Sequence, residues 1–227
     1  MTDTRRPFSN PLALAILVLL YERPMHPYEM ATTLRERGKE RSIRLNYGSL
    51  YTVIEQVLRA KLIAVRETLR EGKRPEKTVY ELTPSGEAEL LDWMRELVSS
   101  PLKEYPQFEA ALSLLPVLPP EEVVDLLEIR LGLLKKTIEG FAVEARLLRE
   151  IRLPRLFSLE SEYFETLTRA EHEFTKGLLA DLRRDTGGLR SGWTKLRQKM
   201  LESKRSGRNE RAHSARARKK KTAEKQL

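Results

Sequence analysis

Apolar and polar positions along the first hundred residues repeat with periods that predict helices and one hairpin. Between residues 46 and 59 the apolar side chains fall at i, i+3, i+4, i+7 and i+8, the spacing of one buried helix face. These are Leu50, Val53, Ile54, Val57 and Leu58. Asn46 precedes them and is a favoured N-cap residue. The first turn of the opposite face is small and polar, and that face carries Gly48, Ser49, Thr52, Glu55, Gln56 and Arg59.

The flanking segments complete a recognisable order of elements. The apolar run from Leu12 to Leu20 predicts a largely buried helix behind Asn10 and Pro11. A second helix is expected to start at Pro27 and to end near Gly38. Strands are expected at 62–70 and 77–82, with a charged turn at 71–76 between them. A fourth helix is expected to follow, capped by Thr83-Pro84. This order predicts a winged helix-turn-helix over residues 10–100.

The N-terminus also has features of an export signal, because Arg5 and Arg6 precede the apolar run. No small-residue cleavage site follows the run, and the run is too short to span a bilayer. We therefore expect a buried helix and not an export signal or a membrane segment.

The second half of the chain has the pattern of long packed helices. From Pro120 to about residue 150, apolar residues alternate at spacings of three and four, which is a heptad seam. A break at Pro154 leads to a second long helix that ends before Gly187. The short connection predicts an antiparallel helical hairpin within a domain at 101–186. The expected fold is mainly α with a small β-hairpin wing.

A narrow apolar stripe on two long helices favours self-association, because the pair cannot bury the stripe alone. The residues expected at the dimer interface are Val124, Leu127, Leu131, Leu134, Ile138, Phe141, Leu148, Phe164, Leu167 and Phe174. The alternative is packing within the chain against the first and fourth helices of the N-terminal domain.

Charge is concentrated at the C-terminus. The chain of 227 residues has a net charge of +9. Residues 195–227 hold 13 Lys and Arg against 3 Asp and Glu, whereas residues 1–194 hold 29 against 30. The basic pI thus belongs to a tail at 187–227, which we expect to be largely disordered. It either binds nucleic acid without sequence preference or is a solvated tail.

The sequence offers no catalytic or metal site. It contains no cysteine, which excludes thiol chemistry and favours a cytoplasmic location. A phosphate-binding glycine loop and a nucleophile elbow are both missing, and His26, His172 and His213 lie far apart in the sequence. We expect neither an enzyme nor a cofactor.

Several short motifs in this order resemble the PadR family of bacterial transcriptional regulators. They are Pro24-Met25-His26-Pro27-Tyr28-Glu29, Gly48-Ser49-Leu50-Tyr51, the basic wing 72–77 with Tyr80, and Leu82-Thr83-Pro84-Ser85-Gly86. Pro27 stands where the family usually has glycine, and Tyr47 where it often has proline. The resemblance covers about residues 12–95. It implies a C-terminal dimerisation domain and a small-molecule effector, whose pocket we expect between the domains near Trp93 and Phe108.

The expected function is that of a homodimeric repressor that binds an inverted-repeat operator in double-stranded DNA. Helix 46–59 is placed to read the major groove through Gly48, Ser49, Thr52 and Gln56. The residues expected to hold the phosphate backbone are Tyr28, Tyr47, Tyr51, Lys73, Arg74 and Lys77. Taken singly, the helix face also fits a solvated surface, and the wing fits a solvated turn. A winged-helix module for protein interaction, or nucleic-acid binding by the tail alone, are the alternatives.

Overall fold

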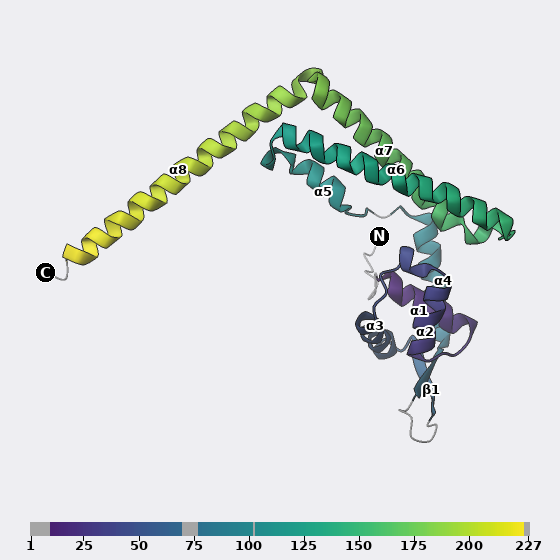
Figure 1. Cartoon of the computed structure of the whole chain (residues 1–227). Helices are drawn as coiled ribbons and strands as arrows, with labels where there is room; N and C mark the ends of the chain where they lie inside the picture. Colours follow the sequence, from purple (N-terminus) through teal and green to yellow (C-terminus); the bar gives the residue numbers. More distant parts are fainter. Residues whose placement is uncertain (1–9, 70–76, 102, 225–227) are drawn as a thin grey trace. The chain divides into compact units, whose positions relative to one another are not determined.

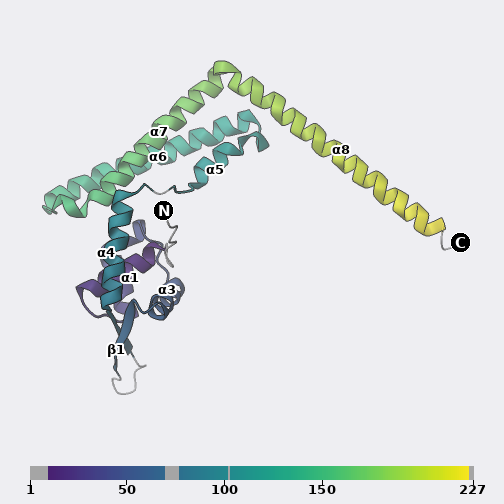
Figure 2. The ribbon, with the colours of Figure 1, turned by 180° about the vertical axis from the view of Figure 1, so that it is seen from behind.

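The computed structural model describes residues 10–69, 77–101 and 103–224. The chain divides into two compact units, Met1–Glu104 and Tyr105–Leu227, so the division falls inside the proline-containing segment 101–106. Figures 1 and 2 show both units from opposite sides.

The N-terminal unit is a winged helix-turn-helix, as predicted. Its elements are α1 (Pro11–Glu22), α2 (Pro27–Glu36), the short 3₁₀ turn η1 (Lys39–Arg41), α3 (Tyr47–Arg59), β1 (Ile63–Leu69), β2 (Lys77–Leu82) and α4 (Pro84–Ser99). The strands form an antiparallel hairpin with an irregularity between Val65 and Glu67. A bridge between Met25 and Tyr80 joins the chain before α2 to β2.

The core of this unit forms around α1, which contacts α3, α4 and β2. Seven of the twelve residues of α1 are buried. The unit itself therefore buries most of this apolar helix, as the apolar run predicted. Asn10 caps the helix, because its side-chain oxygen accepts a hydrogen bond from the Leu12 amide at 2.9 Å.

The C-terminal unit contains the predicted antiparallel hairpin of long helices (Figure 1). Its elements are α5 (Gln107–Ser113), η2 (Leu115–Val117), α6 (Pro120–Glu150), η3 (Arg155–Phe157), α7 (Leu159–Arg184), η4 (Thr186–Gly188) and α8 (Leu189–Glu224). An apolar cluster of Val123, Leu127, Leu179, Leu182 and Trp193 joins α6, α7 and the start of α8.

The segment expected to be a largely disordered tail is instead helical, because it lies in α8, which continues to Glu224. Its first turns carry the apolar residues Trp193 and Leu196, and Trp193 is buried. The rest of the helix is rich in Ala, Arg and Lys, which have high helix propensity. Low hydrophobicity and high charge argued against a packed core here, but they do not exclude a solvated helix.

Candidate nucleic-acid interface

The cap of α3 fixes its first turn, and the packing of one face in the core leaves the opposite face exposed to solvent. The side-chain oxygen of Asn46 accepts a hydrogen bond from the Ser49 amide at 2.7 Å, as the sequence predicted. Leu50, Val53, Ile54 and Val57 are buried in the core of the unit. The predicted reading face, with Gly48, Thr52 and Gln56, is therefore exposed.

Two hydroxyls on this face are oriented by the helix itself. The Ser49 hydroxyl donates to the Asn46 carbonyl at 3.0 Å, and the Thr52 hydroxyl donates to the Gly48 carbonyl at 3.0 Å. Each oxygen keeps lone pairs that can accept a hydrogen bond from a base or a water molecule. The geometry therefore presents two acceptors of fixed direction at the start of an exposed helix.

Tyrosines flank the exposed turn. Tyr51 is 52% exposed and Tyr28, near the start of α2, is 62% exposed. Tyr28 stacks on His26 with ring centroids 6.2 Å apart, and the His26 ring nitrogen caps α2 by accepting the Glu29 amide at 3.2 Å. Pro27 lies at the first position of α2 and is buried. A missing N–H costs nothing at that position, so this departure from the family pattern leaves the helix intact.

The base of the wing lies beside α3. Burial raises the pKa of Tyr80 on β2, and the proximity of Tyr51 and Glu55 on α3 raises it further. The wing tip, with Lys73 and Arg74, lies outside the described residues. Lys77 begins β2 and pairs with Leu69 through the backbone. Tyr47 begins α3, and its side chain is likewise outside the described part of the chain.

A basic segment between α2 and α3 was missed by the sequence analysis. Residues 37–44 contain Arg37, Lys39, Arg41 and Arg44 against one acidic residue, Glu40. Arg37 is engaged by Glu22, with its two terminal nitrogens 2.5 and 2.7 Å from the carboxylate oxygens. Arg41 and Arg44 are exposed shortly before the α3 cap. The density of cations in this short segment was the available signal.

Comparison with known proteins identifies a family for most of the N-terminal unit. Residues 16–92 match the family described as "Transcriptional regulator PadR-like family". They form a PadR-like domain. The family is one of transcription regulators and not of enzymes. No curated protein matches the chain significantly.

Solved PadR-like structures share the fold over most of the chain. PadR of Bacillus subtilis in complex with operator DNA aligns with a TM-score of 0.55 at 21% identity, over 76% of this chain and 99% of that one. The same protein in complex with p-coumaric acid gives 0.54 at 18%, over 78% and 99%. The PadR-like regulator BC1756 of Bacillus cereus gives 0.51 at 14%, over 77% and 99%. Within the described ranges, no helix is long and apolar enough to cross a membrane.

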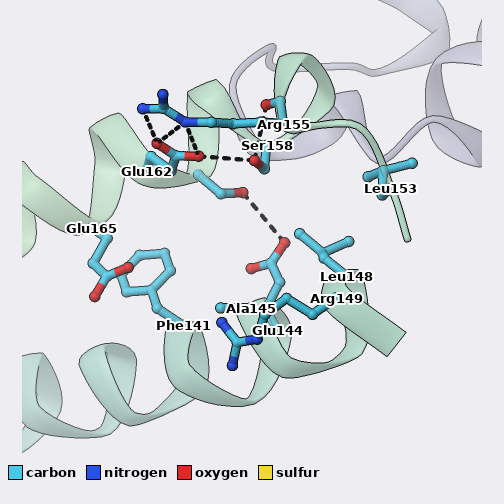
Figure 3. A pocket seen from close by; sticks show the side chains of 11 residues that line it. Phe141, Glu144, Ala145, Leu148, Arg149, Leu153, Arg155, Ser158, Glu162 and Glu165 are labelled. Atoms are coloured by element: carbon cyan, nitrogen blue, oxygen red, sulfur yellow. Dashed lines mark hydrogen bonds and ion pairs between the residues drawn. The ribbon is translucent and has the colours of Figure 1, made fainter. Parts of the chain in front are cut away.

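Outside the PadR-like domain, the unit that begins at Tyr105 has an open cavity at the tip of its helical hairpin (Figure 3). Its volume is about 250 Å³, and it is lined by Phe141, Glu144, Ala145, Leu148, Arg149, Leu153, Arg155, Ser158, Ser161, Glu162 and Glu165. Figure 3 shows Arg155 bound to Glu162 on one wall, with Nη2 and Oε2 at 2.9 Å. The Phe141 ring meets Phe164 edge to face at 5.4 Å.

The two residues expected to mark an effector pocket are engaged within their own units. Trp93 of the N-terminal unit is 5% exposed and belongs to the core around α1. Phe108 on α5 meets the Phe174 ring edge to face at 6.5 Å, and the Arg130 guanidinium lies 3.5 Å from its centroid. The hairpin-tip cavity involves neither residue, and no pattern in the sequence indicated it.

Helix α6 has apolar residues on two opposite faces. The predicted seam residues Val124, Leu127, Leu131, Leu134, Ile138, Phe141 and Leu148 are buried or half-buried, where α6 packs against α7. Further apolar residues at heptad spacing on the far face are exposed, with Leu126 at 45%, Ile129 at 62%, Leu133 at 59%, Val143 at 61% and Leu147 at 55%, and Lys136 and Gly140 interrupt this series. We call this series the outer stripe, and the sequence analysis did not single it out.

Helix α7 packs on α6 through polar as well as apolar residues, and Phe164 meets the Phe141 ring of α6 edge to face. Thr168 and Thr175 are buried, and Ser161 bonds to Glu144 of α6. By contrast Phe164 is 54% exposed, Leu167 49% and Phe174 52%. About half of each of these three predicted dimerisation side chains is therefore exposed in the single chain, although Phe164 also contacts Phe141 and Phe174 contacts Phe108.

Proposed function

We propose that the chain is a homodimeric, sequence-specific transcriptional repressor that an effector molecule releases from an inverted-repeat DNA operator. The observation that carries the proposal is the capped, exposed first turn of α3 within a PadR-like domain. A solved PadR that shares this fold is in complex with operator DNA.

In this proposal α3 enters the major groove with its small first turn foremost. Gly48 allows close approach, Ser49 and Thr52 contact base edges, and Gln56 reaches an adenine edge from the next turn. Tyr28, Tyr47, Tyr51 and the wing residues Lys73, Arg74 and Lys77 hold the phosphates. The basic segment 37–44 adds cations at the same end of α3.

Dimerisation is proposed to cover the outer stripe of α6 together with Phe164, Leu167 and Phe174 of α7. Large apolar side chains exposed at regular spacing along a helix favour an interaction site. A helix with apolar residues on two opposite faces is suited to a position between two partners, and α7 already occupies one face. A two-fold dimer presents two α3 helices, which matches an inverted repeat.

The hairpin-tip cavity is the proposed effector site. It combines the apolar side chains of Phe141, Leu148 and Leu153 with charged groups at its rim, a composition typical of small-molecule pockets. Its volume fits a small, single-ring molecule. A PadR structure that shares the fold contains p-coumaric acid, which is a molecule of that size.

The experiment is a fluorescence anisotropy titration with a duplex from the upstream region of the gene and with a scrambled duplex. Ser49→Ala/Thr52→Ala is expected to abolish the preference for the native duplex. The matched control is Ser113→Ala/Thr194→Ala, because these hydroxyls make the same helix-backbone bonds at 2.7 and 2.9 Å in the other unit of the chain. If the Ser49/Thr52 variant keeps the full preference, α3 is not the reader, and a winged-helix module for protein interaction becomes the better account.

A further inference from the structure

The distal part of α8 has a composition unlike that of a packing helix. From Ser203 to Glu224 it contains no Val, Ile, Leu, Met, Phe, Tyr or Trp. The same 22 residues hold nine Lys and Arg against two Glu. A helix that is polar all round and strongly charged repels itself, and packing contacts cannot stabilise it.

The root of this helix is firmly attached to the C-terminal unit. Trp193 is 7% exposed, and its indole N–H donates to the Leu118 carbonyl at 3.0 Å. The Asp185 carboxylate accepts the backbone amides of Arg190 and Ser191 at 2.7 and 3.0 Å. These bonds hold the Asp185 pKa below its ordinary value, with the bond to Ser191 as the largest cause. The charged continuation of α8 therefore starts from a fixed base.

The sequence of the distal part restricts the kind of partner it can bind. Membrane-surface helices need an apolar face beside their cations, and helices that dock into protein grooves need apolar anchors at i, i+3, i+4 and i+7. Neither is present between 203 and 224. A partner with dense negative charge and little need for apolar contact remains, which is the chemistry of a nucleic-acid backbone.

We propose that residues 204–224 of α8 form a second DNA contact, which binds phosphates without reading sequence. This rests on the proposed function, because DNA held by the PadR-like domain raises the local concentration of phosphates near a tethered helix. At about 1.5 Å per residue, these 21 residues extend roughly 32 Å, close to the ~34 Å of one turn of B-DNA. The contact adds affinity and salt sensitivity and leaves the choice of operator to α3.

The test measures anisotropy over 50 to 300 mM KCl (roughly the range in which counterion release dominates) with the native upstream duplex and the scrambled duplex. Full-length protein is compared with a truncation after Ser203, which keeps Trp193 and the root. It is also compared with R216Q/R218Q/K219Q/K220Q/K221Q. The matched control is R216K/R218K, which keeps every charge. The combined emission of Trp93 and Trp193, both buried, reports that the two units stay folded.

Both the truncation and the glutamine variant are expected to bind each duplex about tenfold or more weakly at low salt. The slope of log affinity against log salt should flatten by about 0.9 for each phosphate that α8 no longer neutralises. The ratio between native and scrambled duplex should stay unchanged, and R216K/R218K should match the full-length protein.

Equal slopes for the full-length protein and the truncation on both duplexes would overturn the proposal. A truncation that loses the preference for the native duplex with its slope intact would overturn it as well, because α8 would then read sequence. Failure of the repressor proposal looks different, because neither full-length protein nor truncation would prefer the native duplex. The slope on the scrambled duplex still tests α8 in that case.

Discussion

The backbone carbonyl of Leu62 occupies the space that a Cβ atom on Gly86 would need. This close approach locks the start of α4 onto the turn between α3 and β1. Thr83 strengthens the junction, because its hydroxyl accepts the Gly86 amide at 3.0 Å and lies 2.9 Å from the Leu62 carbonyl. The Thr-Pro-Ser-Gly sequence thus joins the reading helix, the wing and α4 at one point.

Gly86→Ala is expected to lower the free energy of unfolding of the N-terminal unit by on the order of 3 kcal/mol, because the obstructing atoms belong to the backbone and cannot rotate away. Urea unfolding followed by Trp93 fluorescence in a Trp193→Phe background measures it. Gly132→Ala is the control, because nothing lies within 4 Å of a Cβ there. Gly132→Ala, followed by Trp193 fluorescence in a Trp93→Phe background, should raise the free energy of unfolding of the C-terminal unit by roughly 0.5–1 kcal/mol. Equal effects of the two substitutions would refute the close-approach argument.

Thr175→Val is expected to stabilise the helical hairpin by about 1 kcal/mol. The Thr175 side chain is completely buried, and its hydroxyl has no hydrogen-bond partner, so an apolar group of the same shape removes an unmet polar atom. Thr168→Val is the matched control, because the Thr168 hydroxyl donates to the Phe164 carbonyl at 2.7 Å. It should be neutral or destabilising. Trp193 fluorescence in the Trp93→Phe background reads both, and a loss of stability in Thr175→Val would contradict the assignment.

Acid should weaken the hairpin tip through Glu162. Hydrogen bonds from Arg155 and then from Ser158 hold the pKa of this carboxyl below its ordinary value of 4.5. A lowered folded-state pKa means that the contribution is fully present above about pH 4.5 and is lost as pH falls through the lower folded value. Glu162→Gln should reduce the pH dependence of unfolding in that window, followed by Trp193 fluorescence. The control is Glu104→Gln, which removes the same charge from an exposed residue and should leave the pH dependence of unfolding unchanged. An unchanged pH dependence in both variants would count against Glu162.

Charges placed in the outer stripe should dissociate the proposed dimer. Ile129→Glu/Leu133→Glu puts two carboxylates among apolar side chains that are exposed in the single chain, and burying them in an interface is strongly unfavourable. Sedimentation equilibrium is expected to shift from dimer to monomer. Leu114→Glu/Val117→Glu is the control, because both residues are 65% exposed but lie outside α6. A dimer that survives the first pair of substitutions places its interface elsewhere.

The sequence predicted the N-terminal unit well because its signals are local. Asn46 and Thr83 cap the helices that they were expected to cap, and the apolar period of α3 matches its buried face. The exposed face of α3 follows from the same period. The apolar period does not predict how that face is oriented toward DNA, because periodicity carries no information about a partner.

In the C-terminal unit, local sequence signals did not predict which faces of the helices pack together. A heptad stripe shows which residues share a face but not which helix that face meets, so α6 packs on α7 while its outer stripe stays exposed. On α7 the buried residues include Thr168 and Thr175 beside Leu179 and Leu182, and threonine gives no signal in an apolar pattern. The cavity at the hairpin tip joins residues from two helices and a turn, a juxtaposition that only the folded chain reveals.

The two ends of the hairpin differ in how easily they open. At the base, Leu127, Leu179, Leu182 and Trp193 form a buried apolar cluster, whereas the tip contains a cavity and a largely exposed turn around Leu153 and Leu156. Local opening costs least where buried apolar contacts are few, so amide hydrogens near the tip should exchange with solvent long before those at the base. A molecule that fills the cavity would make local opening of the tip rarer. Its binding would therefore be detected as slower amide exchange at the tip, with exchange at the base unchanged.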